Sequence, residues 1–188
     1  MLLLCGILFL FWTNEWKYSL PTPVPENYKP VGQGATIDIA KKLAPQNGKP
    51  LFLHFFNPAC PCSRFNIPHV QSLVRQYGAQ VNFAVVVISD KHYTEEEIQN
   101  KLDLKVPVLF DSAIAAACGV YSTPQAVLID TGSKLYYRGN YNRSRYCSDK
   151  KTEYARMALE DLLFKMPTTG IDQSAYTSYG CRLPSCTQ

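Results

Sequence analysis

The chain lacks the features that assign many proteins to a class at first sight. Its 188 residues carry a formal net charge of only +4. The lysine and arginine residues are scattered, without a basic block that contains interleaved aromatic residues, so we expect no nucleic-acid partner. The sequence has no Walker loop, no GxGxxG or HExxH motif and no internal repeat, which argues against the corresponding nucleotide-binding, metalloprotease and repeat architectures.

The apolar N-terminus lacks the marks of a cleaved signal peptide. Residues 1–12, MLLLCGILFLFW, are almost wholly apolar, but a single helix needs about 20 residues to span a bilayer. No lysine or arginine precedes this run, and no A-x-A-like cleavage site follows it. We interpret residues 1–18 as an uncleaved membrane anchor or signal-like segment, and the alternative is a buried N-terminal helix.

Prolines recur in the next segment, residues 19–34, SLPTPVPENYKPVGQG. Closely spaced prolines favour an extended chain and resist packing. We therefore predict a linker that lifts a folded domain off a membrane. A domain in that position lies outside the cytoplasm, where disulfides persist.

Residues 35–166 have the pattern of one α/β domain. Short apolar, β-leaning runs predict strands at 51–56, 81–89, 106–111, 125–130 and 134–139. Helical spacing and capping signals predict helices at 36–43, 63–77, 94–102, 112–118 and 152–165. In the last helix we expect five residues to face the core: Tyr154, Met157, Ala158, Leu162 and Phe164. This order predicts a mixed central sheet flanked by helices, followed by an irregular, cysteine-containing extension at 167–188.

Two cysteines, Cys60 and Cys62, flank Pro61 where the first strand is expected to lead into a helix. In open α/β sheets, sites are commonly found at the carboxyl ends of strands. Unpaired N–H groups and the helix dipole at such a junction lower the pKa of a thiol. We interpret Cys60 as the nucleophile and Cys62 as the second thiol. The alternative is that both are small, buried hydrophobic residues.

The segment LFLHFFNPACPCSRFNIPHV resembles the active-site segment of thioredoxin-like proteins, with Pro68 where that family's kinked helix carries its proline. Ser-Thr-Pro at 122–124 resembles the family's cis-proline loop, and ACGVYSTPQAVLIDTGSKLYYRG is similar to the periplasmic redoxin branch (TlpA/ResA-like or peroxiredoxin-like). The resemblance implies a thioredoxin-like fold in which Thr123 and Pro124 dock a bound peptide or thiol partner. An ordinary trans Thr-Pro bond is the alternative.

Two features depart from that family. Only one residue separates the cysteines, so a Cys60–Cys62 disulfide would close a tight, strained ring that suits an oxidant or isomerase better than a strong reductant. Alternatively, Cys60 works with a different cysteine. His54 lies near the position where thioredoxins carry a buried acid that relays protons. It is either a proton relay or a buried core histidine.

Four further cysteines need partners or surroundings. Cys118 is expected in the core, with a third thiol near the site as the alternative. We expect Cys147 to pair with either Cys181 or Cys186, although the sequence does not assign connectivity. If the extension instead folds over the active site, one of its cysteines would be a resolving thiol.

These observations predict a membrane-tethered thiol–disulfide oxidoreductase of the bacterial cell envelope, anchored to the inner membrane with its domain in the periplasm. Cys60 would attack a disulfide of a protein partner, and Cys62 would release the product without a metal or organic cofactor. The alternative is a Cu(I)-binding metallochaperone that uses the Cys-Pro-Cys clip. The absence of any histidine after His92 counts against it. A peroxidase ranks last because FFNPAC lacks the PxxxT/SxxC pattern.

Overall fold

The computed structural model describes residues 2–16, 19–38, 43, 47–166 and 171–184. Its strands are β1 (Leu51–Phe56), β2 (Asn82–Val87), β3 (Val108–Leu109), β4 (Ser122–Thr123), β5 (Gln125–Ile129), β6 (Leu135–Gly139) and β7 (Cys181–Arg182). Its α-helices are α1 (Leu2–Phe11), α4 (Pro61–Phe65), α5 (Ile67–Tyr77), α6 (Glu95–Leu102), α7 (Ala113–Cys118) and α8 (Tyr154–Phe164). Short π or 3₁₀ turns occur at Trp12–Trp16, Lys150–Thr152 and Gln173–Ala175.

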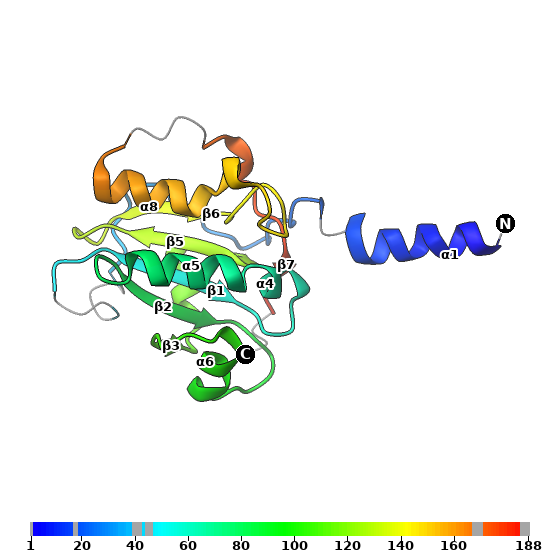
Figure 1. The fold of residues 1–188 in the computed structure, drawn as a ribbon, viewed down its shortest axis with the longest axis horizontal. Helices are drawn as coiled ribbons and strands as arrows, with labels where there is room; N and C mark the ends of the chain where they lie inside the picture. The colour runs from blue at the N-terminus through cyan, green and yellow to red at the C-terminus, as the bar shows by residue number, and fades with distance from the viewer. Residues whose placement is uncertain (1, 17–18, 39–42, 44–46, 167–170, 185–188) are drawn as a thin grey trace.

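A five-stranded sheet in the order β3-β2-β1-β5-β6 forms the centre of the domain (Figure 1). β1 pairs with β2 in parallel and with β5 antiparallel, and β5 and β6 form an antiparallel hairpin. The parallel β1-α5-β2 unit, the β5-β6 hairpin and the closing helix α8 make up a thioredoxin-like fold. The structure therefore confirms the predicted mixed α/β architecture and all five predicted strands of this sheet.

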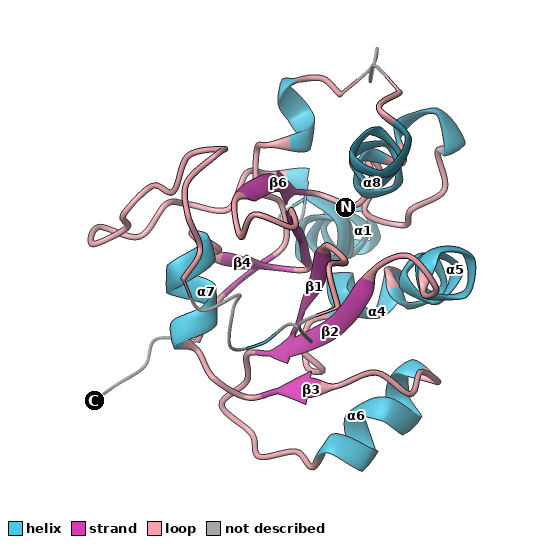
Figure 2. Ribbon diagram, turned by 90° about the vertical axis from the view of Figure 1, so that its left-hand side faces the viewer, coloured by secondary structure: helices cyan, strands magenta, loops and turns pink. Residues whose placement is uncertain are grey.

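The sheet has a separate hydrophobic cluster on each face because side chains alternate between the two sides of a strand. On β1, Phe52 and Phe56 belong to the cluster under α5, α6 and α8. Leu53 and Phe55 belong to the opposite cluster, which includes side chains of α7. Figure 2 shows α7 on one side of the sheet and α5 and α8 on the other. All six residues of β1 are buried, so the end of the strand, from which the chain continues to Cys60, is held by packing on both faces.

The helices differ from the predicted ones in three places. The helix predicted at 63–77 is divided by Asn66 into α4 and α5, because Pro68 has no N–H to continue a helix and is tolerated only in a first turn. In α8, Phe164 is 51% exposed, so its predicted place in the core is wrong. Of the helix predicted at 36–43, residues 39–42 lie outside the described residues, and Thr36 forms an isolated antiparallel β-bridge with Lys134 in place of a first helical turn. The predicted capping box of α6, between Thr94 and Glu97, is present.

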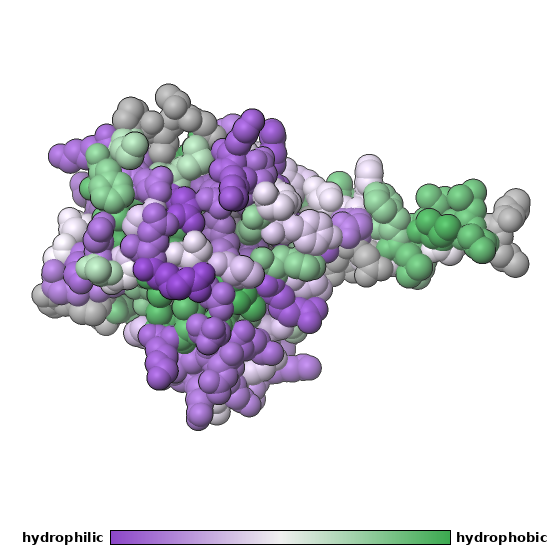
Figure 3. Space-filling view, viewed as in Figure 1, coloured by the Kyte–Doolittle hydropathy of each residue, from purple (hydrophilic) through white to green (hydrophobic). Residues whose placement is uncertain are grey.

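The N-terminal helix α1 extends away from the sheet, and its side chains are apolar and exposed (Figures 1 and 3). Among the described residues, no helix is both long enough and apolar enough to cross a membrane. Membrane attachment of this helix therefore stays a prediction.

The described part of the proline-rich segment lies against the domain. The amide of Thr22 donates a hydrogen bond of 2.7 Å to the carbonyl of Ser178, and Arg138 donates one of 2.7 Å to the carbonyl of Val31. The rings of Tyr28 and Tyr121 pack edge to face with their centroids 4.9 Å apart. These contacts differ from the free linker that the prolines suggest, while the domain boundaries themselves stay predictions.

Candidate active site

The junction between β1 and α4 is built by a short network around Asn57. The Asn57 side chain accepts a hydrogen bond of 2.9 Å from the amide of Ala59, and its carbonyl accepts one of 3.0 Å from the amide of Cys60. Buried Ser63 accepts a hydrogen bond of 3.3 Å from the amide of Asn57. This network places Cys60 at the N-cap position of α4, where its side chain makes no capping hydrogen bond. Pro61 in the first turn loses no helical hydrogen bond.

The loop opposite Cys60 has the geometry that the family resemblance implies. The Thr123–Pro124 peptide bond is cis, and Thr123 is fully buried. The Cys60 sulfur lies 3.6 Å from the carbonyl oxygen of Thr123. The predicted cysteine motif and the predicted cis-proline loop are therefore in direct contact, although Cys60 and Thr123 lie 63 positions apart in the sequence.

The structure gives Cys60 a partner other than Cys62. Cys60 and Cys181 form a disulfide with their Cα atoms 6.1 Å apart. The predicted Cys60–Cys62 disulfide is thus absent from this state, and the predicted pairing of Cys147 with Cys181 is wrong. Cys186 lies outside the described residues. The structure agrees with the other possibility, that the extension folds over the site, and Cys181 is the site residue that the sequence did not single out.

The strand that carries Cys181 pairs with the cis-proline loop. β7 lies antiparallel to β4, with Cys181 opposite Thr123. Gly180 has φ of +140°, and a side chain there would clash with the carbonyl oxygen of Thr123. Glycine is required at this position because other residues rarely adopt such a conformation and because the two backbones approach closely.

Further upstream, the extension is held by buried polar side chains. Asn140 donates hydrogen bonds of 2.8 and 2.6 Å to the carbonyls of Ser174 and Thr177. Gln125 donates a hydrogen bond to the hydroxyl of Ser178, and both of these residues are buried. The part of the extension next to Cys181 is therefore a fixed part of the domain.

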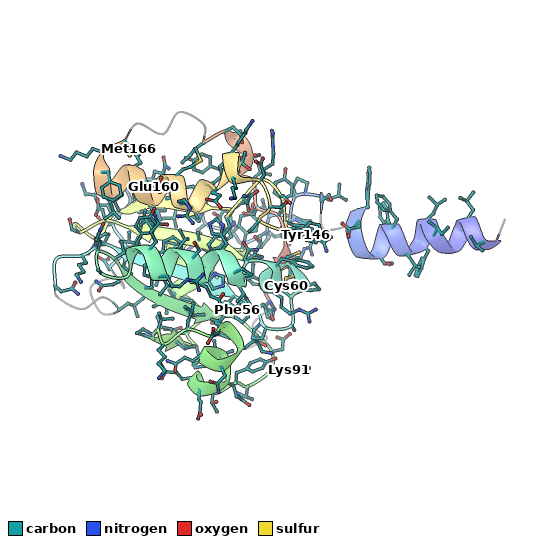
Figure 4. All side chains as sticks on the ribbon, in the orientation of Figure 1. Phe56, Cys60, Lys91, Tyr146, Glu160 and Met166 are labelled. Carbon is teal, nitrogen blue, oxygen red and sulfur yellow. A yellow bond between two sulfur atoms is a disulfide. The ribbon has the colours of Figure 1, made fainter. Side chains whose placement is uncertain are left out.

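Cys62, in the first turn of α4, is not part of the disulfide. The sulfur atoms of Cys60, Cys62 and Cys181 all lie within 4.8 Å of one another. Among the three, only Cys62 lines a cavity of about 500 Å³. Figure 4 shows this end of the molecule, with Cys60 and Tyr146 labelled near the base of α1. The cavity is lined by Glu15, Ser19, Cys62, Asn66, Pro124, Asn140, Asn142, Arg143, Ser144, Arg145, Tyr146, Ser174, Tyr179 and Gly180.

His54 is buried in the sheet and is 1% exposed. Its Nδ1 atom lies 2.7 Å from the hydroxyl of Tyr141. Burial, with a smaller contribution from the nearby His69, lowers the pKa of His54 to about 3. An imidazole with that pKa is neutral near pH 7, which fits the core-histidine alternative better than the proton relay.

The other two described cysteines of the domain form no disulfide; Cys118 is buried and Cys147 is half-buried. Cys118 is fully buried in the core, as expected, and burial raises its pKa to about 12. Cys147 donates a hydrogen bond of 2.9 Å to the Asn66 side chain, and burial raises its pKa to about 12 as well. Neither is activated as a thiolate in these surroundings.

Two solved structures share the fold over most of the chain. An uncharacterized conserved protein from Geobacillus kaustophilus is 22% identical and covers 90% of this chain and all of its own, with a TM-score of 0.64. A hypothetical protein from Sinorhizobium meliloti is 18% identical and covers 83% of this chain and 96% of its own, with a TM-score of 0.63. At these identities the likeness establishes the fold alone.

The thioredoxin domain of a thiol-disulfide oxidoreductase from Bacteroides vulgatus matches more weakly, at 12% identity and a TM-score of 0.47, over 62% of this chain and 94% of its own. We draw no conclusion from a likeness at that level. A comparison with curated proteins finds no match.

The sheet and the cis-proline loop make up a thioredoxin-like fold, and β7 places Cys181 beside that loop. Residues 31–183 match the family model described as a domain of unknown function, DUF6436, and the chain belongs to that family.

Proposed function

We propose that the protein is a thiol–disulfide oxidoreductase that exchanges disulfides with protein partners through Cys60 and Cys62. The observation that carries this proposal is a disulfide on Cys60, placed against the cis-proline loop with a further thiol, Cys62, within 4.8 Å. Thiol–disulfide exchange needs a thiolate close to a disulfide and no other cofactor. Three sulfurs at one site meet that requirement.

In this proposal Cys60 and Cys62 form the cluster at which electrons enter or leave the protein. In the reducing direction one of these thiolates attacks a partner disulfide, one partner sulfur leaves as a thiolate, and a mixed disulfide forms. A second protein thiol then attacks the protein's own sulfur in the mixed disulfide, which releases the partner as a dithiol and leaves a disulfide in the protein. The oxidising direction is the reverse. Pro124 lines the cavity in which the partner would dock, Thr123 pairs with the strand that carries Cys181, and His54 lies buried in β1.

The proposal includes attachment to the inner membrane of a bacterial cell envelope, with the domain in the periplasm. Exposed apolar side chains on α1 and the rings of Trp12 and Trp16 support an interfacial contact with lipid. Flotation of the full chain with phospholipid vesicles tests this part. Protein that stays at the bottom of the gradient with and without vesicles would remove it.

A redox titration of the full chain in glutathione buffers tests the function. Each point is alkylated, digested and mapped by mass spectrometry. We expect a reversible disulfide on Cys60 with a potential between about −270 and −120 mV, the span of catalytic thiol–disulfide proteins. A Cys60 disulfide that stays oxidised across the whole series would identify a structural bridge and contradict the proposal.

A second candidate, Cu(I) binding, is favoured by one observation. Among the described residues, the cysteines at 60, 62 and 181 form a group whose sulfurs are close enough to hold one ion, and soft thiolates select Cu(I). Only the reduced protein offers all three. Titration of reduced protein with Cu(I) against a chromophoric chelator tests it, with Cys181→Ser as the comparison. Equal, weak binding by both proteins would exclude a three-thiolate site.

A further inference from the structure

The edge where a thioredoxin-like protein receives a partner strand is already occupied. β4 carries Thr123, and β7 pairs with it through the backbone, which places the Cys181 sulfur on Cys60. An extended peptide that adds to a sheet edge needs unpaired backbone groups there. At β4 these groups face the chain's own extension, so Cys181 stands where the cysteine of a docked partner would stand.

Several contacts with the rest of the domain hold β7 in place beside β4. Gly180 permits the close approach of β7 to Thr123, and hydrogen bonds from Asn140, Gln125 and Thr22 hold the residues just before it. Several of these polar groups are buried, and removing their partners would cost about 1–3 kcal/mol each. Displacing the strand to admit a peptide at β4 is therefore unfavourable.

A second route to the sulfur cluster is open on the side of Cys62. The cavity of about 500 Å³ is lined by Cys62 and by Pro124 and Gly180, which flank the disulfide, but by neither of the disulfide's own cysteines. Pockets of roughly 300–1,000 Å³ accept small ligands, so this volume is enough for a cysteine on a protruding loop. Most of its other lining residues are polar, including Asn66 and Asn142.

We propose that β7, which carries Cys181, occupies the place of a partner strand and that an external dithiol partner exchanges at Cys62. Electrons then pass from the partner to Cys62, from Cys62 to Cys60, and from Cys60 to Cys181. This rests on the proposed function. It assigns Cys181 as a catalytic residue of that reaction and assigns the cavity as the entry for the partner's cysteine.

The relay balances in three exchanges. The Cys62 thiolate attacks the Cys60 sulfur, which forms Cys60–Cys62, breaks Cys60–Cys181 and leaves a Cys181 thiolate that takes up a proton. A partner thiolate then attacks the Cys62 sulfur through the cavity and releases Cys60 as a thiolate, which is also protonated. The partner's second thiolate attacks its own sulfur in this mixed disulfide and releases Cys62. The partner dithiol is oxidised to a disulfide, and the Cys60–Cys181 disulfide is reduced to two thiols.

The test follows oxidation of a peptide with two cysteines by the full-length protein, oxidised beforehand and shown by mass spectrometry to contain Cys60–Cys181. We expect Cys62→Ser to slow peptide oxidation by about 100-fold or more, because the relay loses its intramolecular step. Cys181→Ser should instead contain Cys60–Cys62 after oxidation, because the sulfur that otherwise pairs with Cys60 is lost. Cys5→Ser, a change at an exposed residue of α1, is the matched control.

Two further measurements keep the result independent of folding defects. Gly180→Ala retains every cysteine but pushes β7 from Thr123, so its oxidised form should shift from Cys60–Cys181 toward Cys60–Cys62. A peptide with a single cysteine should form its mixed disulfide at Cys62 in the wild type. Circular dichroism confirms that each variant is folded before its rate is used.

The outcomes separate this inference from the function it rests on. Fast oxidation by Cys62→Ser, a mixed disulfide mapped to Cys60 or Cys181, or an unchanged Cys60–Cys181 linkage in Gly180→Ala would overturn the relay. If the wild type oxidises no peptide, or Cys60→Ser remains active, the oxidoreductase proposal itself fails. An inactive Cys60→Ser together with an active Cys62→Ser would refute only the order of the thiols.

Discussion

Cysteines occupy two kinds of surroundings in this protein. Three of them meet at the end of β1, where a helix start, the cis-proline loop and the C-terminal strand come together. Cys118 and Cys147 are surrounded by packed side chains, and burial raises the pKa of each to about 12. Burial occurs in both groups, since Cys60, Cys62 and Cys118 are 2%, 3% and 0% exposed, and each group also has one half-buried member, Cys181 or Cys147. What distinguishes the cluster is the proximity of other sulfurs, so burial by itself does not mark a thiol as structural.

The largest expected difference between the two groups is in activity. Cys60→Ser should reduce disulfide exchange with a model peptide by at least about 100-fold, because the central sulfur is lost. Cys118→Ala should leave the rate unchanged and lower the free energy of unfolding by about 0.5–3 kcal/mol. The rate of disulfide exchange with the peptide measures the first effect, and urea unfolding measures the second. Loss of exchange in Cys118→Ala at full folding would erase the distinction.

The next difference is in alkylation after reduction. At pH 8 a thiol with a pKa of about 12 is ionised to about one part in 10,000, against about one quarter for a free thiol with a pKa near 8.5. We therefore expect iodoacetamide to modify Cys118 and Cys147 at least about 1,000-fold more slowly than Cys5, an exposed thiol. Time-resolved peptide mapping measures each rate. Comparable rates for the buried and exposed thiols would show that the two solitary cysteines are not shielded.

A smaller effect concerns His54, a buried histidine of β1. Its folded pKa of about 3 lies below the ordinary 6.5, so between these values the unfolded state binds more protons and stability falls as the pH decreases. Where only the unfolded state binds the proton, the free energy of unfolding falls by about 1.4 kcal/mol per pH unit. Between pH 6 and 5 the free energy of unfolding of His54→Gln should therefore fall by about 1 kcal/mol less than that of the wild type, as measured by urea unfolding. Identical losses would indicate that His54 is protonated or exposed in the folded state.

The smallest expected effect is that of Cys147→Ser. This thiol donates to Asn66, whose amide donates a hydrogen bond of 3.0 Å to the carbonyl of Cys62. A serine hydroxyl can keep that bond, so we expect stability to change by less than about 1.5 kcal/mol and exchange by less than about threefold. Peptide-oxidation kinetics of the variant and the wild type measure the change in exchange rate. A rate reduced about 100-fold would place Cys147 in the reactive group and break the comparison.

Local signals in the sequence were sufficient for much of the fold. β1 was predicted with its observed bounds because its apolar run is compact and flanked by Lys49-Pro50 and Asn57-Pro58. The capping box of α6 was predicted because both of its hydrogen bonds join residues three positions apart. The cis Thr123–Pro124 bond followed from a resemblance, since nothing local distinguishes it from a trans bond.

The partner of Cys60 depends on contacts that leave no local pattern. Cys181 lies 121 positions away, and the residues around it, GCRLPSC, show neither helical nor strand periodicity. Its strand is only two residues long and depends on pairing with β4. Gly180 is the one local hint, because a glycine before a cysteine permits the close backbone approach found there. The break at Asn66 was missed for a related reason, since Pro68 fits either within a kinked helix or in the first turn of a new one.

The same long separation links the redox state of the protein to its lifetime. A bridge that closes a loop of 121 positions restricts the unfolded chain, which in the chain-entropy treatment is worth about 5 kcal/mol. Such an amount is comparable to the whole stability of many domains, about 5–15 kcal/mol. Each reduction of Cys60–Cys181 therefore increases the unfolded population that proteases degrade, so molecules that remain reduced are removed sooner than molecules that are promptly reoxidised.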